Sequence, residues 1–148
     1  MTSPDAPNEL AAFLDAVGQT MYSPEHLTVM ALAGPPSESF EEERDGAAWQ
    51  YQVSERSGVT LQFREQVLVA ALIRLVADDE DAAYPALGAL VPGLTLPASR
   101  ADIRAHYGAT RHEDPDMDLY LVGDHYLRFD FVDGQSVALT VILLGATA

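Results

Sequence analysis

The sequence contains no cysteine and no lysine, and these two absences exclude several kinds of chemistry. Without cysteine there are no disulfides, no thiolate nucleophiles and no cysteine-bound zinc. Without lysine there is no Schiff-base catalysis and no phosphate loop that relies on lysine. All 8 basic residues are therefore arginines.

Long hydrophobic runs are also missing. The longest apolar stretches, 67–73 and 137–144, fall far below the roughly 20 residues that a membrane helix needs. Residues 1–7 lack the basic start and apolar run of a signal peptide. We therefore expect a cytoplasmic protein that makes no use of a membrane.

Positive charge is scarce relative to negative charge. The 148 residues carry 23 acidic and 8 basic side chains, a formal net charge of −15. Nucleic acid repels such a surface, because binding a phosphate backbone requires clustered cations. A basic protein partner is attracted by it, although the charge can also serve solubility alone. A hydrophobic content of 48% is enough for one ordinary domain with a core.

The first half of the sequence predicts two capped helices followed by strands. Asn8 is a helix N-cap, and its helix ends at Gly18. Ser23 precedes a proline at the first helical position, and Gly34 ends this second helix. Alternation then predicts strands. These are 49–53, 59–63 and 67–76, the last of which could also be a short helix.

The second half repeats this plan after a charge run at 78–81 and a possible short helix at 82–90. Ser99 caps a helix that ends at Gly108. Strands 119–122, 125–131 and 137–144 follow, with a hairpin turn at Asp133-Gly134.

The two halves align in detail, which predicts an internal duplication. Segment 59–63 matches 127–131, and one extra residue at the next turn aligns 67–73 with 136–142. The predicted fold is α+β: two helix–β-meander repeats form an antiparallel sheet of about six strands, with helices on one face. The strand 137–144 is apolar on both faces, so we expect it to be central or to pair with a second copy. The expected segments are a disordered tail (1–7), repeat 1 (8–77), a linker with a short helix (78–98) and repeat 2 (99–148).

The second repeat resembles a known domain. The features are a capped helix from Ser99 to Gly108, then Tyr120, the strand 126–131 and Asp133-Gly134. They resemble the domain shared by β-lactamase inhibitory protein and the outer-membrane assembly lipoproteins of the small-protein-A type. The resemblance implies protein binding through a sheet surface or a loop end. The chain lacks their lipid-anchoring cysteine, signal peptide and disulfides. The resemblance therefore implies neither their membrane role nor their secretion. Size and charge also resemble those of bacterial immunity proteins.

Catalytic and metal-binding patterns are absent from the sequence. The four histidines have no paired-ligand spacing. Asp114, Asp116 and Asp118 start like a calcium loop, but Leu119 stands where glycine is needed and His125 where a glutamate is needed. The sequence also has no nucleophile elbow, dinucleotide fingerprint or phosphate loop. We expect no enzyme activity, no metal and no cofactor.

Two acidic loops, 35–46 and 109–118, occupy matching places in the two halves. If the halves join side by side, these loops form one negative end of the molecule. We therefore expect a protein-binding module, an inhibitor or an immunity-type protein, that meets a basic partner there. Trp49 and Tyr120 begin equivalent strands beside the loops and are candidate anchors. The candidate binding residues are Glu41, Glu42, Glu43, Asp45, Trp49, Glu113, Asp114, Asp116, Asp118 and Tyr120.

Two alternatives stay open at this point. One is a small-molecule or metal-dependent enzyme or sensor with a pocket between helix and sheet. The other is a structural homo-oligomer, of which a homodimer is the simplest form.

Overall fold

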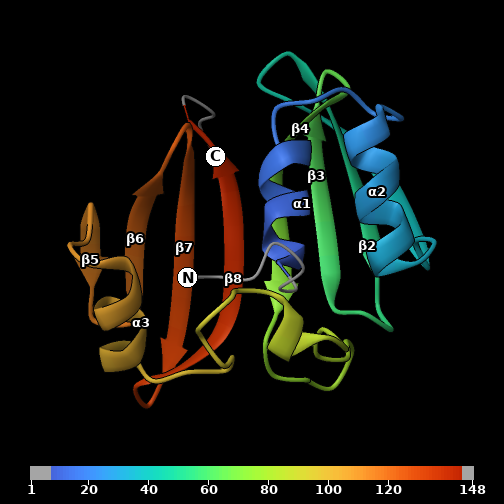
Figure 1. Ribbon diagram of the computed structural model, residues 1–148. Coiled ribbons are helices and arrows are strands. Elements are labelled where there is room, and N and C mark those ends of the chain that lie inside the picture. The colour runs from blue at the N-terminus through green and yellow to red at the C-terminus, as the bar shows by residue number, and fades with distance from the viewer. Residues whose placement is uncertain (1–7, 145–148) are drawn as a thin grey trace.

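The computed structural model describes residues 8–144, which fold into three α-helices and one antiparallel sheet of eight strands (Figure 1). The predicted α+β class with an antiparallel sheet is confirmed. The predicted tail, 1–7, lies outside the described residues. The helices are α1 (Glu9–Ala16), α2 (Pro24–Ala33) and α3 (Arg100–Tyr107), with a 3₁₀ turn η1 (Leu87–Ala89). The strands are β1 (Glu38–Arg44), β2 (Ala47–Ser54), β3 (Val59–Arg64), β4 (Val67–Arg74), β5 (His112–Asp114), β6 (Met117–Val122), β7 (His125–Val132) and β8 (Gln135–Leu143).

The helices begin where the capping residues predict. The side chains of Asn8, Ser23 and Ser99 each accept a hydrogen bond from a backbone N–H three residues on, at 3.1–3.3 Å. These bonds satisfy amides that have no partner inside the helix. Gly34 and Gly108 end α2 and α3 as expected. Helix α1 stops two residues before the predicted Gly18, because Val17 already has extended backbone angles.

The sheet consists of two four-stranded meanders joined at the centre. The strand order is β1-β2-β3-β4-β8-β7-β6-β5, and every neighbouring pair is antiparallel. The expected six strands become eight because both predicted acidic loops contain an edge strand, β1 and β5. Tight turns cause this. Asp45-Gly46, with φ of 55° and 77°, has the twist that folds β1 back onto β2.

The apolar run after Gln66 is a strand, β4, which resolves the choice between strand and helix. It pairs with β8, so both strands lie at the centre of the sheet. Apolar side chains on both faces fit this central position, and the expectation that the strand over 137–144 is central is confirmed. Leu72 faces Thr140 in the middle of this pair.

The two meanders share a register irregularity. The pairing shifts between Gln62 and Phe63 in one half, and between Asp130 and Phe131 in the other, which are positions matched by the sequence alignment. Phe63 then pairs with Leu68, and Phe131 pairs with Ser136. The turns between these pairs have the same length, so the extra residue expected at the second turn is wrong. The apolar alternation suggested it because a bulge shifts the inward positions by one.

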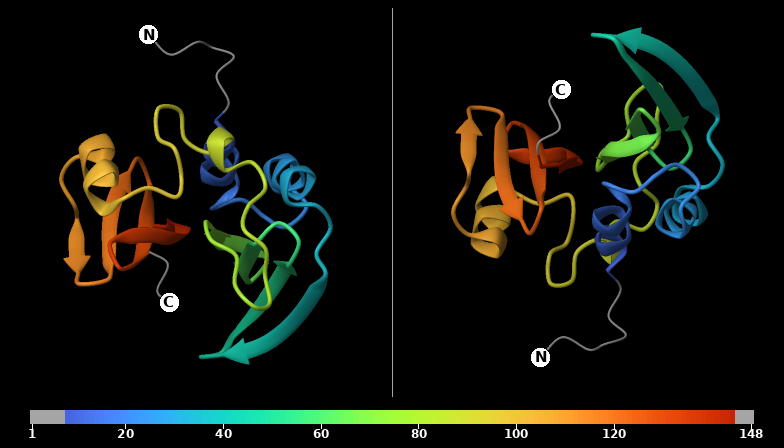
Figure 2. Two further views of the ribbon diagram at one scale, coloured as in Figure 1. Left: turned by 90° about the horizontal axis from the view of Figure 1, so that it is seen from below. Right: turned by 90° about the horizontal axis from the view of Figure 1, so that it is seen from above.

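The main core lies between the helices and the sheet. Its buried side chains come from all three α-helices, from β3, β4, β6, β7 and β8, and from the segment 78–98. The α-helices lie in front of the sheet in Figure 1 and on one side of it in Figure 2. Tyr84 and Leu90 are fully buried, so this predicted linker is part of the core. The His125 Nε2 atom lies 2.8 Å from the Val17 carbonyl oxygen and ties β7 to the end of α1.

A smaller cluster lies on the other face of the sheet, the open face. The side chain of Gln52 contacts His26 on α2, so Gln52 points toward the helices. Because side chains alternate along a strand, Trp49 and Tyr51 point the opposite way. They pack with Ala47 and Val69. In Figure 2 the β1–β2 hairpin curls away from the helices.

Candidate protein-binding surface

The β1–β2 hairpin has one strand that is exposed along its whole length. All seven residues of β1 are exposed, whereas β2 is mostly buried. Four of the seven are glutamates, Glu38, Glu41, Glu42 and Glu43, and one is Arg44. Asp45 adds a fifth carboxylate at the turn. The hairpin is therefore a strongly negative arm at one edge of the sheet.

Three rings form an aromatic row on the open face of this hairpin. Phe40 stacks on Tyr51 with 4.7 Å between ring centroids, and Tyr51 stacks on Trp49 at 6.5 Å. The Arg44 guanidinium lies 4.0 Å from the Trp49 ring centroid, a cation–π distance. Trp49 and Tyr51 are more than 90% buried, while Phe40 keeps 45% of its surface exposed. The row therefore presents one half-exposed ring beside two buried ones.

The hydroxyl of Tyr51 links the row to the glutamates. It donates a hydrogen bond of 2.9 Å to Glu42 Oε1. Burial of the ring, with this bond, raises the pKa of Tyr51 above its usual value. The hydroxyl therefore stays protonated and holds Glu42 in place across the hairpin.

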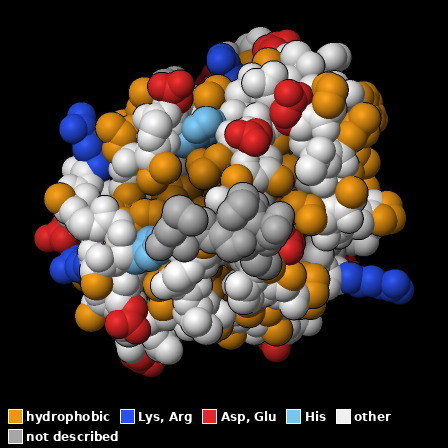
Figure 3. Space-filling view, viewed as in Figure 1, with side chains coloured by type: hydrophobic (Ala, Val, Ile, Leu, Met, Phe, Trp, Pro, Cys, Tyr) orange, Lys and Arg blue, Asp and Glu red, His pale blue; other side chains and the backbone are white. Residues whose placement is uncertain are grey.

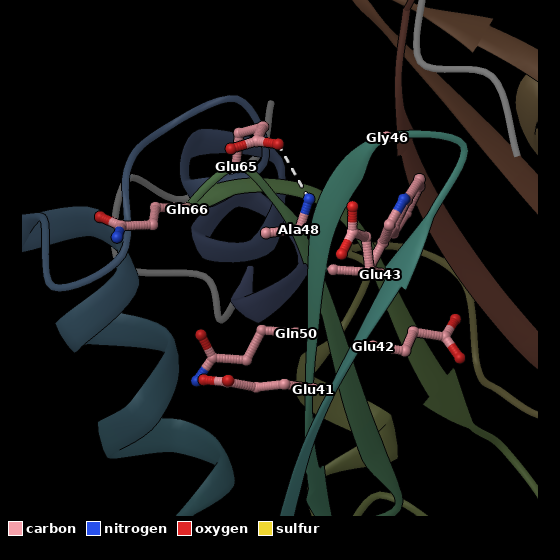
Figure 4. Close-up of a pocket in the computed structure, with 9 residues that line it drawn as sticks. Glu41, Glu42, Glu43, Gly46, Ala48, Gln50, Glu65 and Gln66 are labelled. Atoms are coloured by element: carbon pink, nitrogen blue, oxygen red, sulfur yellow. Dashed lines mark hydrogen bonds between the residues drawn. The ribbon is translucent and has the colours of Figure 1, made fainter.

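The opposite side of the hairpin forms an open hollow of about 620 Å³. Glu41 faces Gln50 and Glu43 faces Ala48 in the β1–β2 register. Figure 4 shows Glu41 and Gln50 close together on this side, with Glu42 pointing to the other. Glu65, from the β3–β4 turn, closes the hollow by accepting a bond of 2.8 Å from the Ala48 N–H. The result is an open acidic surface on the helix-facing side of the hairpin.

The second acidic segment has a different structure. Asp118 is fully buried, and its carboxylate accepts hydrogen bonds from Arg100 at 2.7 Å, Arg104 at 3.0 Å and the Tyr120 hydroxyl at 3.1 Å. Burial alone would raise the pKa of Asp118, but these bonds outweigh it and lower the pKa to about 2. Burial and the charge of Asp118 raise the pKa of Tyr120 to about 12. Asp118 and Tyr120 thus fix α3 on the sheet, and neither side chain is available as a surface contact.

The remaining acids of this segment lie at the far edge. Glu113 accepts a bond from Arg104 at 2.7 Å, and Asp114 lies 3.4 Å from His112. Asp114 and Asp116 are exposed. Arg100 also donates to the carbonyl oxygens of Asp114, Pro115 and Met117, so the β5–β6 turn is held against α3.

The expectation of one negative end is wrong. Strands β1 and β5 form opposite edges of the sheet, with β2, β3, β4, β8, β7 and β6 between them. Two meanders that join through their last strands necessarily place their first strands farthest apart. In Figure 3, acidic side chains are scattered around the helix side and do not gather at one end. Of the candidate residues, the structure brings together Glu41, Glu42, Glu43, Asp45 and Trp49 on the hairpin.

Sequence reasoning missed Phe40, Tyr51 and Glu65 as members of this surface. Phe40 is the one apolar residue in an acidic segment, for which the sequence predicts a loop. The Asp45-Gly46 pair ahead of an alternating strand was the available signal, because this dipeptide favours a two-residue hairpin turn and so implies a strand before it. Glu65 joins the surface through the β3–β4 turn. The strands expected at 59–63 and 67–76 place Glu65 in a turn, but they do not indicate its contact with Ala48.

Comparisons with known proteins identify no family for this chain. No family model, no curated protein and no solved structure matches it. Within residues 8–144, no three or more His, Asp or Glu side chains are grouped so that they could hold a metal ion. No helix in that range is long and apolar enough to cross a membrane.

Proposed function

We propose that this chain is a non-catalytic protein-binding module that contacts a basic partner through the β1–β2 hairpin. The single observation that carries the proposal is the exposed β1 strand, whose glutamates surround an aromatic row with one exposed ring. Aromatic side chains dominate binding energy at interfaces, and flanking charges set the rate and choice of partner. An inhibitor or immunity-type role is the form of this function that the charge favours.

The proposal restricts the site to one half of the molecule. The far-edge acids, Glu113, Asp114 and Asp116, lie across the sheet from the hairpin and belong to the α3 contact network or to solvent. We propose that they contribute to solubility and not to the interface. This division makes the two edges a matched pair for an experiment.

We also propose that the two meanders are structural repeats, each with its helix on the same face of the sheet. Two correspondences support this: the register shifts fall at matching positions, and the central pairs are symmetric about Leu72 and Thr140. In this view the first repeat carries the binding surface, and the second completes the sheet.

The test is affinity capture from the native host with three forms of the protein. The wild type should retain a basic protein at low salt and release it at high salt, because the surface is ionic. The variant Glu41→Gln/Glu42→Gln/Glu43→Gln should lose that protein. The control Glu113→Gln/Asp114→Asn/Asp116→Asn removes the same number of charges from the other edge and should retain it. Equal capture by both variants, or no captured protein at low salt, would contradict the proposal.

A further inference from the structure

The outer edge of β1 is an unpaired strand edge. Among residues 8–144, β1 pairs with β2 and with no other strand, and its seven residues are all exposed. Alternate residues of an edge strand direct their N–H and C=O groups outward, where they can template another strand. The opposite edge differs, since β5 has three residues and its turn is clamped by Arg100. One long and open edge is therefore available.

The side chains of β1 define what can pair with it. Glu41 and Glu43 line one face, and Glu38 and Glu42 flank Phe40 on the other. An added strand places its side chains about 5 Å from these groups, where opposite charges attract and like charges repel. Arginine or lysine side chains therefore fit both faces, and an apolar side chain fits against the exposed ring of Phe40.

The same pattern disfavours a second copy as the occupant. If β1 of one molecule paired with β1 of another, each strand would bring four glutamates and one arginine, so two strands of the same net charge would lie side by side. Charged residues on an edge are also a common protection against such self-pairing. A hetero-partner with cationic side chains satisfies the same carboxylates that exclude the second copy.

We infer that β1 binds an extended cationic segment of a partner protein by strand addition, so that the segment becomes a ninth strand of the sheet. This inference rests on the proposed function and adds the mode of binding and the chemistry of the partner segment. Backbone hydrogen bonds to β1 supply affinity, the glutamates select cationic side chains, and Phe40 accepts an apolar one.

The experiment uses a short synthetic peptide that alternates arginine and valine, together with the whole 148-residue chain. The control peptide has the same side chains, but it carries N-methyl groups on alternate amides along each of its two edges. It therefore keeps its charge and cannot form a ladder of backbone hydrogen bonds from either edge. Strand addition predicts that N-methylation weakens binding at least about tenfold, since it removes several backbone hydrogen bonds. Hydrogen exchange should show new protection within residues 38–44 with the unmodified peptide alone.

A pair of protein variants separates side-chain selection from general attraction. Glu41→Gln/Glu43→Gln should weaken peptide binding about five- to tenfold, as expected for two cross-strand ion pairs. Asp114→Asn/Asp116→Asn should leave it unchanged. If both peptides bind equally, or if protection appears away from residues 38–44, strand addition is wrong while capture of a basic partner by the hairpin can still hold. If the unmodified peptide does not bind, the inference is overturned.

Discussion

Each half of the molecule links its helix to the second strand of its meander with a buried polar contact, but the chemistry differs. In the first half, His26 on α2 meets Gln52 on β2, a contact between neutral groups at 3.4 Å. In the second half, Arg100 and Arg104 on α3 meet Asp118 on β6. Gln52 and Asp118 occupy corresponding positions, since one pairs with Leu61 and the other with the matching Phe129.

The difference follows from how far each contact lies from water. His26 is fully buried, and its Nδ1 atom accepts a bond of 2.8 Å from the Tyr22 N–H, so the neutral ring is satisfied. Burial lowers the pKa of His26, a shift that the bond to Gln52 partly offsets. The guanidinium groups of Arg100 and Arg104 remain partly exposed, so only the carboxylate of Asp118 is removed from water. One architecture therefore accepts a neutral or a charged link according to local access to solvent.

The largest effect is expected from breaking the charged link. Asp118→Ala leaves Arg100 and Arg104 without their shared partner and the Tyr120 hydroxyl without an acceptor. Removing one member of a buried ion pair costs about 3–5 kcal/mol, and the exposed guanidinium groups place this case at about 3–4 kcal/mol. Urea unfolding measures the change in the free energy of unfolding. The exposed Asp116→Ala should change it by less than about 0.5 kcal/mol. If Asp118→Ala lowers the free energy of unfolding by less than about 1 kcal/mol, Asp118 is not the link that holds α3 on β6.

A second contrast concerns the turns after β2 and β6. Gly58 has φ of 66°, and a Cβ there would lie 2.2 Å from the Ala82 carbonyl oxygen. Gly123 has φ of 60°, and a Cβ there would meet nothing within 4 Å. Gly58→Ala should therefore cost about 2–3 kcal/mol, from backbone strain and a clash, and Gly123→Ala about 1 kcal/mol from strain alone. Thermal or urea unfolding of both variants gives the comparison, and equal losses would disprove the close packing of Ala82.

The neutral link should be the weaker of the two. His26→Phe keeps a ring against Phe63, which lies 5.0 Å away between centroids, but leaves the Tyr22 N–H without its acceptor. An unsatisfied buried donor costs about 1–3 kcal/mol, and the retained ring places this variant at about 1–2 kcal/mol. The exposed His112→Phe serves as the control. The comparison fails if His26→Phe destabilises the protein more than Asp118→Ala does.

As the pH falls, the first half of the molecule should lose stability before the second half does. The pKa of His26 is lowered from 6.5, so its contribution is present above pH 6.5 and is lost as pH falls through the lowered value. The pKa of Asp118 is lowered from 3.8 to about 2, so its contribution is present above pH 3.8 and is lost only as pH falls toward 2. Amide hydrogen exchange at pH 7, 5 and 3 should show α2 losing protection before α3. The variant His26→Phe should not show the early loss of protection in α2. If α3 loses protection before α2, the predicted order is wrong.

Much of the fold follows from local signals in the sequence. The three N-caps and the Asp133-Gly134 turn depend on neighbouring residues alone, and the structure confirms them. The central position of β8 follows from its apolar side chains on both faces. These features were predictable because the residues that define them lie close together in the chain or belong to one strand.

The remaining features depend on distant residues. Alternation in β2 and β6 separates two faces but does not say which one the helix covers. In both strands a polar residue, Gln52 or Asp118, faces the helix, because the helix supplies a partner for it. The acids of β1 do not alternate with apolar residues. The turn that follows β1 is therefore the sequence signal that indicates its pairing with β2. The candidate site was therefore predicted in part: its charges and Trp49 were recognised, and Phe40, Tyr51 and the strand edge were not.

The pairing of β4 with β8 has a consequence for assembly of the chain. These two strands are the innermost pair of the sheet, yet residues 75–134 separate them in sequence. While the polypeptide is being synthesised, the first meander is complete long before β8 leaves the ribosome. The outer edge of the apolar strand β4 stays unpaired during that interval. Contacts between residues so distant in sequence also form slowly. Shortening the chain before β8 would make this transient vulnerability permanent and would produce aggregates through the interior strand.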